Sequence, residues 1–100
     1  MNLHGILAAT VLPMDERYRI DRPALKRYLG WLVGQGVHGL AVNVDTGEGP
    51  HLSQAERLLV IETARSVAGA LPVISGLAPS STEAAVRAAR ELKSAGADAL

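Results

Sequence analysis

The chain has 100 residues, enough for one domain at most, and 48% of them are hydrophobic, as in a folded globular protein. Ten basic and ten acidic residues give a formal net charge of zero, so no long-range field favours nucleic acid or an anionic membrane as a partner. Cysteine is absent, which excludes disulfide frameworks, thiolate nucleophiles and cysteine-based zinc sites. No apolar run reaches the ~18 residues of a membrane span and the amino terminus lacks signal-peptide features, so we expect a cytoplasmic protein.

The first third of the chain predicts a buried strand followed by an amphipathic helix. Residues Gly5–Leu12 form a nearly continuous apolar run, typical of a parallel strand covered on both faces. Asp21 is the expected N-cap of a helix that has Pro23 in its first turn, and Gly36 is expected to end this helix in a left-handed conformation. The apolar stripe of the helix consists of Leu25, Tyr28, Leu29, Leu32 and Val33.

A second strand and helix are predicted in the middle of the chain. Residues Gly39–Val44 form the strand, and after a polar loop Ser53 and Glu56 match the Ser-x-x-Glu capping box of a helix that runs to Ala68. Arg57 is expected to be solvated on this helix. The residues expected to face inward are Leu58, Ile61, Ala64 and Ala68.

The last third repeats the same order. Residues Pro72–Leu77 are the expected third strand, and Ser80 with Glu83 predicts a second capping box at the start of a helix that ends at Gly96. Residues Ala97–Leu100 are expected to open a fourth strand. The inward residues of this third helix are predicted to be Ala85, Val86, Ala89 and Leu92.

Alternating strands and helices indicate an α/β fold with a parallel sheet and right-handed crossovers. A doubly wound domain could almost be completed in this length, but the sequence stops inside the apolar run 97–100 without a turn or cap. A (β/α)8 TIM barrel needs ~250 residues. We therefore predict that residues 1–100 are the amino-terminal part of a single barrel domain, comprising three βα units and the start of strand four.

The loop after the second strand is the best candidate for a binding site. Ligands of parallel α/β folds bind at the carboxyl ends of the strands. The loops to search are therefore 13–20, 45–52 and 78–81. Period-two alternation predicts that Asn43 and Asp45 point into the mouth of the sheet. Asp45 could then accept a proton or hold a hydroxyl group, while Thr46 and Gly47 would expose backbone N–H groups suited to a carboxylate. A purely structural turn remains an equal alternative, because Asp-Thr-Gly also satisfies local backbone groups.

Metal binding is a weaker hypothesis for the same loop. Asp45, Glu48 and His51 are oxygen and nitrogen ligands within seven residues, as a metal-dependent aldolase would need. Loop residues three apart have no fixed geometry and a second histidine is not nearby in the sequence, so we predict no metal and no other cofactor. His4 and His38 lie at the amino ends of the predicted strands, where a structural role is expected.

An ordered set of sequence stretches covers the whole chain: GILAATVLPMDE, RIDRPAL, GVHGLAVNVDTGE, HLSQAERLLVIETA, PVISGL, SST and AGADAL. Together they resemble the dihydrodipicolinate synthase and N-acetylneuraminate lyase family of Schiff-base aldolases. The most distinctive part is Thr46-Gly47-Glu48 followed by Leu52-Ser53-x-x-Glu56-Arg57. The resemblance implies a TIM-barrel lyase, usually a homotetramer, in which a lysine on a later strand forms a Schiff base with pyruvate or another 2-oxo acid and a tyrosine relays protons.

The resemblance also assigns roles to the loop. In the family pattern Gly-Thr-Thr-Gly-Glu, the second threonine and its backbone bind the carboxylate of the oxo acid, a role that falls here to Thr46 with Gly47. The first threonine, which joins the proton relay, is replaced by Asp45, so a sugar-derived 2-oxo acid handled by an aldolase or dehydratase fits as well as pyruvate. Lys26 and Lys93 fall on predicted helices away from the site, which implies that the nucleophile lies outside these 100 residues.

The leading interpretation is therefore a dihydrodipicolinate synthase-like lyase with a small-molecule 2-oxo acid substrate and no nucleic-acid or membrane partner. A noncatalytic α/β module is the alternative from another class. Such a module would bind a partner through the exposed edge of its parallel sheet, because unclosed strands must either pair or aggregate.

Overall fold

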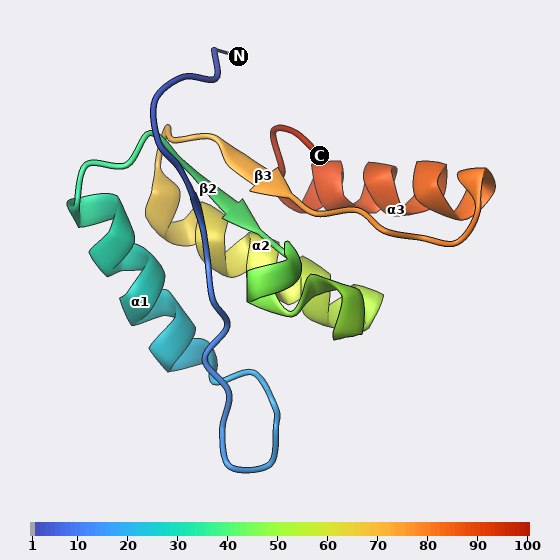
Figure 1. Cartoon of the computed structure of the whole chain (residues 1–100), viewed down its shortest axis with the longest axis horizontal. Helices are drawn as coiled ribbons and strands as arrows, with labels where there is room; N and C mark the ends of the chain where they lie inside the picture. Colours follow the sequence, from blue (N-terminus) through green and yellow to red (C-terminus); the bar gives the residue numbers. More distant parts are fainter. Residues whose placement is uncertain (1) are drawn as a thin grey trace.

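The computed structural model describes residues 2–100, in which three parallel strands alternate with three helices (Figure 1). The elements are β1 (Leu7–Ala9), α1 (Arg22–Gly34), β2 (Gly39–Val42), α2 (Gln54–Ala68), β3 (Val73–Ser75) and α3 (Thr82–Ala95). The strand order is β1-β2-β3 and every pairing is parallel. The predicted α/β class and the predicted order of elements are confirmed. No helix within the described residues is long and apolar enough to cross a membrane.

Helix α1 begins and ends where its sequence signals predict. The Asp21 side chain accepts a hydrogen bond of 3.0 Å from the backbone N–H of Ala24, which satisfies one of the free donors of the first turn. Leu25 and Leu29 are fully buried on its inner face. Gly36 follows with φ of 83°, a left-handed conformation that glycine adopts without steric cost.

Helix α2 carries the predicted capping box. Ser53 Oγ accepts from the Glu56 N–H at 3.1 Å, and Glu56 Oε1 accepts from the Ser53 N–H at 2.8 Å. The buried residues of this helix are Val60, Ile61, Thr63, Ala64 and Ala68. Three of the four residues expected to face inward are thus buried, and Leu58 is half-buried at the margin of the core.

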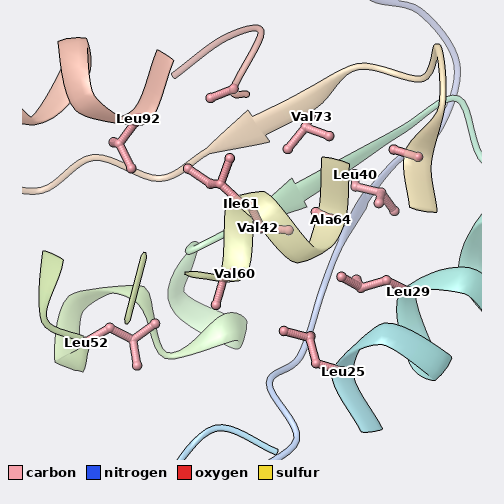
Figure 2. Close-up of a cluster of buried hydrophobic side chains, with 12 residues drawn as sticks. Leu25, Leu29, Leu40, Val42, Leu52, Val60, Ile61, Ala64, Val73 and Leu92 are labelled. Carbon is pink, nitrogen blue, oxygen red and sulfur yellow. The ribbon is translucent and has the colours of Figure 1, made fainter. Parts of the chain in front are cut away.

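The core lies between the sheet and the helices that cover one of its faces, with α2 at its centre (Figure 2). Leu40 and Val42 of β2 and Val73 of β3 are fully buried, as is Ile61 of α2. Each such side chain contributes about 1.5–3 kcal/mol relative to full exposure. Helix α3 supplies a single buried side chain, Leu92, so it is the least firmly anchored of the helices.

The strands are shorter than the apolar runs that predict them. The run Gly5–Leu12 yields only β1, and Pro72–Leu77 yields only β3. An apolar run reports burial, whereas a strand also requires a neighbour to share its hydrogen bonds. The run Gly39–Val44 stops at Val42 because Asn43 adopts φ of 56° and leaves the extended conformation.

The predicted capping box of α3 is wrong. The N-cap is Ser81, whose Oγ accepts from the Ala84 N–H at 3.2 Å, and not Ser80. Glu83 instead forms an ion pair of 3.2 Å with Arg87, one turn further along the helix. The sequence offers two consecutive serines, and the spacing rule cannot choose between them when both are exposed.

The inward face predicted for α3 is also partly wrong. Val86 is 44% exposed, whereas Leu92 is fully buried. Leu92, near the carboxyl-terminal end of α3, is the residue of this helix that belongs to the buried core around α2 and β3 (Figure 2).

The residues after α3 begin the predicted fourth strand. Ala99 forms a parallel bridge with Ile74 of β3. The Asp98 N–H donates to the Val73 carbonyl at 2.8 Å, and the Ser75 N–H donates to the Ala99 carbonyl at 3.0 Å. The chain thus returns to the free edge of β3 in the orientation that a βα repeat requires.

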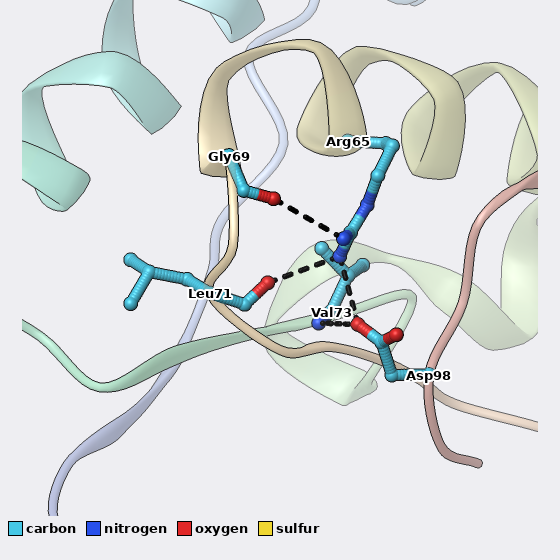
Figure 3. Close-up of polar contacts among 5 residues, drawn as sticks. All are labelled: Arg65, Gly69, Leu71, Val73 and Asp98. Atoms are coloured by element: carbon cyan, nitrogen blue, oxygen red, sulfur yellow. Dashed lines mark hydrogen bonds and ion pairs between the residues drawn. The ribbon is translucent and has the colours of Figure 1, made fainter. Parts of the chain in front are cut away.

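A polar clamp fixes this return at the amino end of the sheet (Figure 3). The guanidinium of Arg65 on α2 donates from Nη2 to the Leu71 carbonyl at 3.0 Å and to Asp98 Oδ2 at 2.8 Å. The same Asp98 oxygen accepts from the Val73 N–H at 2.9 Å. One ion pair therefore joins α2, β3 and the start of the fourth strand.

Candidate active site

The candidate site is a hollow at the carboxyl ends of the three strands. Ala9 closes it from the end of β1, the turn around Asp45 and Thr46 from the end of β2, and residues Gly76–Ala78 from the end of β3. Most of the wall is apolar, so the polar groups of the turn after β2 stand out. The structure brings Asp45 and Thr46 to the edge of the sheet where the topology predicts them.

The turn after β2 is a short 3-10 helix, Asp45–Gly47, followed by a second one, Gly49–His51. The Gly47 N–H donates to the Val44 carbonyl at 3.0 Å, so the expectation that Gly47 exposes a free backbone donor is wrong. The N–H groups of Asp45 and Thr46 stand at the start of the turn, and within residues 2–100 neither has a hydrogen-bond acceptor. The free donors therefore lie one residue earlier than predicted.

The side chain of Thr46 fastens this turn to the end of β1. Thr46 Oγ1 donates to the Thr10 carbonyl at 2.9 Å. Gly47 is buried, and a Cβ at this position would lie 3.1 Å from the same carbonyl oxygen. Thr10 is itself 2% exposed, and its N–H donates to the Ala41 carbonyl at 3.1 Å. The buried residue that directly follows β1 thus fixes the position of the turn relative to the sheet.

Asn43 forms part of the wall of the hollow, but its amide points toward α2, so the prediction that its side chain points into the mouth of the sheet is wrong. Its Nδ2 donates to Ser75 Oγ at 3.1 Å and to the Arg57 carbonyl at 3.2 Å, which turns the amide toward α2. The left-handed backbone at Asn43 breaks the period-two alternation that the prediction assumes. Buried Asn43 therefore ties β2, β3 and α2 together behind the site.

Two glycines pack directly against the backbone of this bend. A Cβ on Gly49 would lie 1.8 Å from the Asn43 carbonyl oxygen, and a Cβ on Gly76 would lie 2.0 Å from it. Neither position has room for a side chain unless the backbone moves. The sequence analysis predicts no role for either glycine, although Gly76 directly follows β3, and the end of a strand is where close backbone approaches occur.

Arg57 is another residue whose environment is predicted wrongly, because it is expected to be solvated. It is half-buried, and its Nε donates to the Gly49 carbonyl at 2.9 Å. It also lines a second groove, between α2 and α3, where Gln54 Nε2 donates to Glu91 Oε2 at 3.0 Å. The capping box places Arg57 on the first turn of α2, and a donor there can reach back to the loop that precedes the helix. Arg57 holds the second 3-10 turn in place.

Metal binding finds no support in the geometry. Among residues 2–100, no three His, Asp or Glu side chains come together to hold a metal ion, so Asp45, Glu48 and His51 do not form the cluster that this hypothesis needs. The other two histidines lie away from the hollow. His38 Nδ1 accepts from the Ile6 N–H at 2.9 Å, and the rings of His4 and His38 are 4.9 Å apart.

The loop after β1 has its own electrostatic anchor. The Asp15 carboxylate accepts from the backbone N–H of Arg19 at 3.0 Å and of Arg17 at 2.8 Å, and it pairs with the Arg19 guanidinium at 3.3 Å. These interactions, above all the backbone hydrogen bond from Arg19, lower the pKa of Asp15 below its ordinary value of 3.8. The guanidinium of Arg19 is thus partly committed to the loop itself.

Comparison with known proteins places these observations in a family context. Residues 2–100 match the profile of the Dihydrodipicolinate synthetase family. The chain is 42% identical over 96 residues to the 4-hydroxy-tetrahydrodipicolinate synthase of Acidiphilium cryptum, covering 95% of this chain and 33% of that protein. It is 37% identical over 99 residues to the enzyme of the same name from Bartonella quintana, covering 98% of this chain and 34% of that protein.

A solved structure agrees with the sequence comparison. The dihydrodipicolinate synthase of Aquifex aeolicus superimposes with a TM-score of 0.87 and 33% sequence identity, over 97% of this chain and 33% of that one. The chain therefore spans about a third of the length of the proteins that it matches.

Proposed function

Because the chain belongs to the Dihydrodipicolinate synthetase family, we propose that it forms the amino-terminal third of a TIM-barrel lyase that acts on pyruvate or a related 2-oxo acid. In this proposal residues 1–100 are part of a single barrel domain, and the remaining strands close the sheet between β1 and the strand that begins at Ala97. The free edges of β1 and of the fourth strand are the places where those strands would pair.

The carboxylate of the oxo acid would bind to the turn after β2. The N–H groups of Asp45 and Thr46 have no acceptor among the described residues and start a 3-10 turn beside the hollow. Such backbone donors suit an anion, because their dipoles are fixed before the ligand arrives. Gly47 would contribute by its small size, since it lets the turn sit against the Thr10 carbonyl. This placement of the turn is the observation that carries the proposal.

The covalent chemistry would come from a lysine outside these residues. Lys26 on α1 and Lys93 on α3 are exposed, and neither lines the hollow at the ends of the strands. In the proposed reaction the amine of a lysine on a later strand condenses with the 2-oxo carbonyl and releases water, giving a protonated imine that withdraws electrons from the adjacent carbon. Asp45, at the edge of the hollow, would orient the substrate or relay a proton.

We further propose that the complete protein is a homo-oligomer, as the family resemblance implies, and that it is cytoplasmic. Analytical ultracentrifugation of the complete protein tests this part, and a sedimenting species of monomer mass at micromolar concentration would contradict it.

The experiment that tests the proposed function is reductive trapping. The reading frame would be followed past Leu100, and its product treated with pyruvate and sodium borohydride. Hydride reduces the imine to a secondary amine, so the protein gains the mass of a reduced pyruvyl group on one lysine, which peptide mass spectrometry locates. We expect an adduct on a lysine beyond residue 100. The absence of an adduct with several 2-oxo acids, or a frame that ends at Leu100, would contradict the proposal.

A further inference from the structure

Asn43 connects the end of β2 to the turn that carries the free N–H groups. Its backbone adopts φ of 56°, a left-handed conformation that most side chains disfavour and that asparagine tolerates better than other non-glycine residues. Strand β2 ends at Val42, and the turn begins at Asp45. The direction in which the chain leaves Asn43 therefore decides where the N–H groups of Asp45 and Thr46 point.

The side chain of Asn43 holds this bend from outside the turn. Its Nδ2 donates to Ser75 Oγ at 3.1 Å and to the Arg57 carbonyl at 3.2 Å. Ser75 Oγ in turn donates a hydrogen bond to the Gly76 carbonyl at 3.0 Å. Both N–H groups of the amide are thus used, and the bend is fastened to β3 and α2, two elements that contribute to the core.

The amide keeps this orientation although one of its atoms has no partner. Asn43 is 4% exposed, and its Oδ1 is buried with no hydrogen-bond partner within residues 2–100. Turning the amide over would bring Oδ1 to the hydroxyl of Ser75. It would also set Oδ1 against the Arg57 carbonyl oxygen, and two acceptors cannot bond to each other. A buried acceptor without a donor is unfavourable, so the asparagine has a cost.

Glycine at position 43 would avoid both costs of this residue. It adopts a left-handed conformation without steric penalty and has no side-chain oxygen to leave unpaired. Asparagine offers in exchange only the two hydrogen bonds that fasten the bend. Backbone strain that the surrounding structure maintains is typical of functional sites, and Asn43 forms part of the wall of the hollow.

We infer that Asn43 is a positioning residue of the proposed lyase site, whose amide holds the bend from which the N–H groups of Asp45 and Thr46 bind the carboxylate. The inference rests on the proposed function and adds to it a residue that acts without binding the substrate. Both N–H groups of the amide are bonded to protein groups, and Oδ1 is an acceptor, so Asn43 offers a carboxylate no donor. Its effect passes through the backbone of the turn.

Asn43→Gly separates the amide from the backbone conformation, because glycine retains the left-handed bend and loses only the side-chain hydrogen bonds. In the complete protein, the pyruvate concentration needed for half-maximal borohydride trapping should rise roughly tenfold, the loss expected when donors to an ionised acceptor are misaligned. A purely structural role would instead lower the fraction of folded protein, and so the amount of adduct at saturation. An unchanged half-saturating concentration, whatever the amount of adduct, would overturn the inference.

Two further variants show whether the effect belongs to the amide. Tyr18→Gly also places glycine at a left-handed residue, with φ of 60°, in the exposed loop after β1, and should leave the half-saturating concentration unchanged. Ser75→Ala removes one of the two acceptors of the amide. It should raise the concentration by a smaller factor and have no further effect when combined with Asn43→Gly. An equal rise in Tyr18→Gly, or full additivity of the other two substitutions, would overturn the inference.

A measurement without substrate distinguishes this inference from the proposed function. Residual dipolar couplings report the orientation of backbone N–H bonds. In the 15N-labelled complete protein, the couplings of Asp45 and Thr46 should change in Asn43→Gly but not in Tyr18→Gly. Unchanged couplings in Asn43→Gly would overturn the inference and leave the lyase proposal standing if pyruvate is trapped. Absence of any adduct in the unsubstituted protein would overturn the lyase proposal and the inference together.

Discussion

Replacing Gly76 by alanine should destabilise the protein by an amount that its surroundings set. The new Cβ would lie 2.0 Å from the Asn43 carbonyl oxygen and 3.2 Å from the Val44 nitrogen. An ordinary contact needs at least 3.4 Å, so two strand ends must separate by more than 1 Å. Overpacking of this kind costs about 1–3 kcal/mol, and we expect a value near 3 kcal/mol because the obstacle is backbone and cannot rotate away.

The matched control for this substitution is Gly30→Ala. Gly30 lies inside α1, and a Cβ there would have no atom within 4 Å. Alanine in a helix interior is more stable than glycine by about 0.5–1 kcal/mol, so the same chemical change should stabilise the protein at this site. Urea unfolding followed by circular dichroism measures both free energies. Values for Gly76→Ala and Gly30→Ala within 0.5 kcal/mol of each other would refute the close approach at the end of β2.

Three further substitutions test other parts of the account. Leu92→Ala should lower the free energy of unfolding by about 2–5 kcal/mol, because Leu92 is the one side chain of α3 that is fully buried. Urea unfolding measures this loss, and Val86→Ala, at an exposed position of the same helix, is the control. Arg65→Met should lower the free energy of unfolding by only about 1 kcal/mol, since the ion pair with Asp98 is partly exposed. It should nevertheless accelerate hydrogen exchange of the Asp98 amide, and an unchanged exchange rate would contradict the role of Arg65 in the polar clamp. The Asp15 pKa is lowered in the folded state, so its contribution to stability is complete above the ordinary value of 3.8 and is lost as pH falls through the folded pKa. Titration of the loop amides by NMR should show a midpoint below 3.8, which Asp15→Asn abolishes.

The sequence predicts most of the fold because its signals are local and agree with one another. The capping box at Ser53, the N-cap at Asp21 and the glycine after α1 each satisfy backbone groups within a few residues. The burial of Ile61, Ala64 and Ala68 along α2 follows from periodicity alone. These features need no knowledge of distant contacts, and the structure confirms them.

Two of the errors concern places where distant parts of the chain meet. The side chain of Asn43 is turned toward α2 by a left-handed backbone, and its partner Ser75 lies 32 residues away. Arg57 looks like a solvent-facing helix residue until Gly49 is placed beside it. Periodicity and spacing describe one element at a time and carry no record of such contacts. The choice of Ser81 over Ser80 is a local error, because the spacing rule fits both serines and does not choose between them.

The candidate site, too, could be predicted from the sequence only in part. Topology alone predicts that the turn after β2 stands at the mouth of the sheet, and Asp45 and Thr46 are there. Which backbone donors are free depends on the 3-10 geometry that occupies the Gly47 N–H. The role of Thr10 in holding Thr46 could not be read from the sequence, because it acts through its backbone carbonyl, which every residue possesses.

The proposal that the turn after β2 binds the substrate carboxylate is tested most directly by mapping changes in backbone amide chemical shifts. Pyruvate would be added to the 15N-labelled complete protein, and backbone resonances followed by NMR. We predict that the largest shifts occur at the free N–H groups of Asp45 and Thr46, with a smaller shift at Gly47, whose N–H is already bonded to Val44. Largest shifts in the groove between α2 and α3, at Gln54 and Arg87, or no shift at Thr46, would contradict the claim that this turn binds the carboxylate.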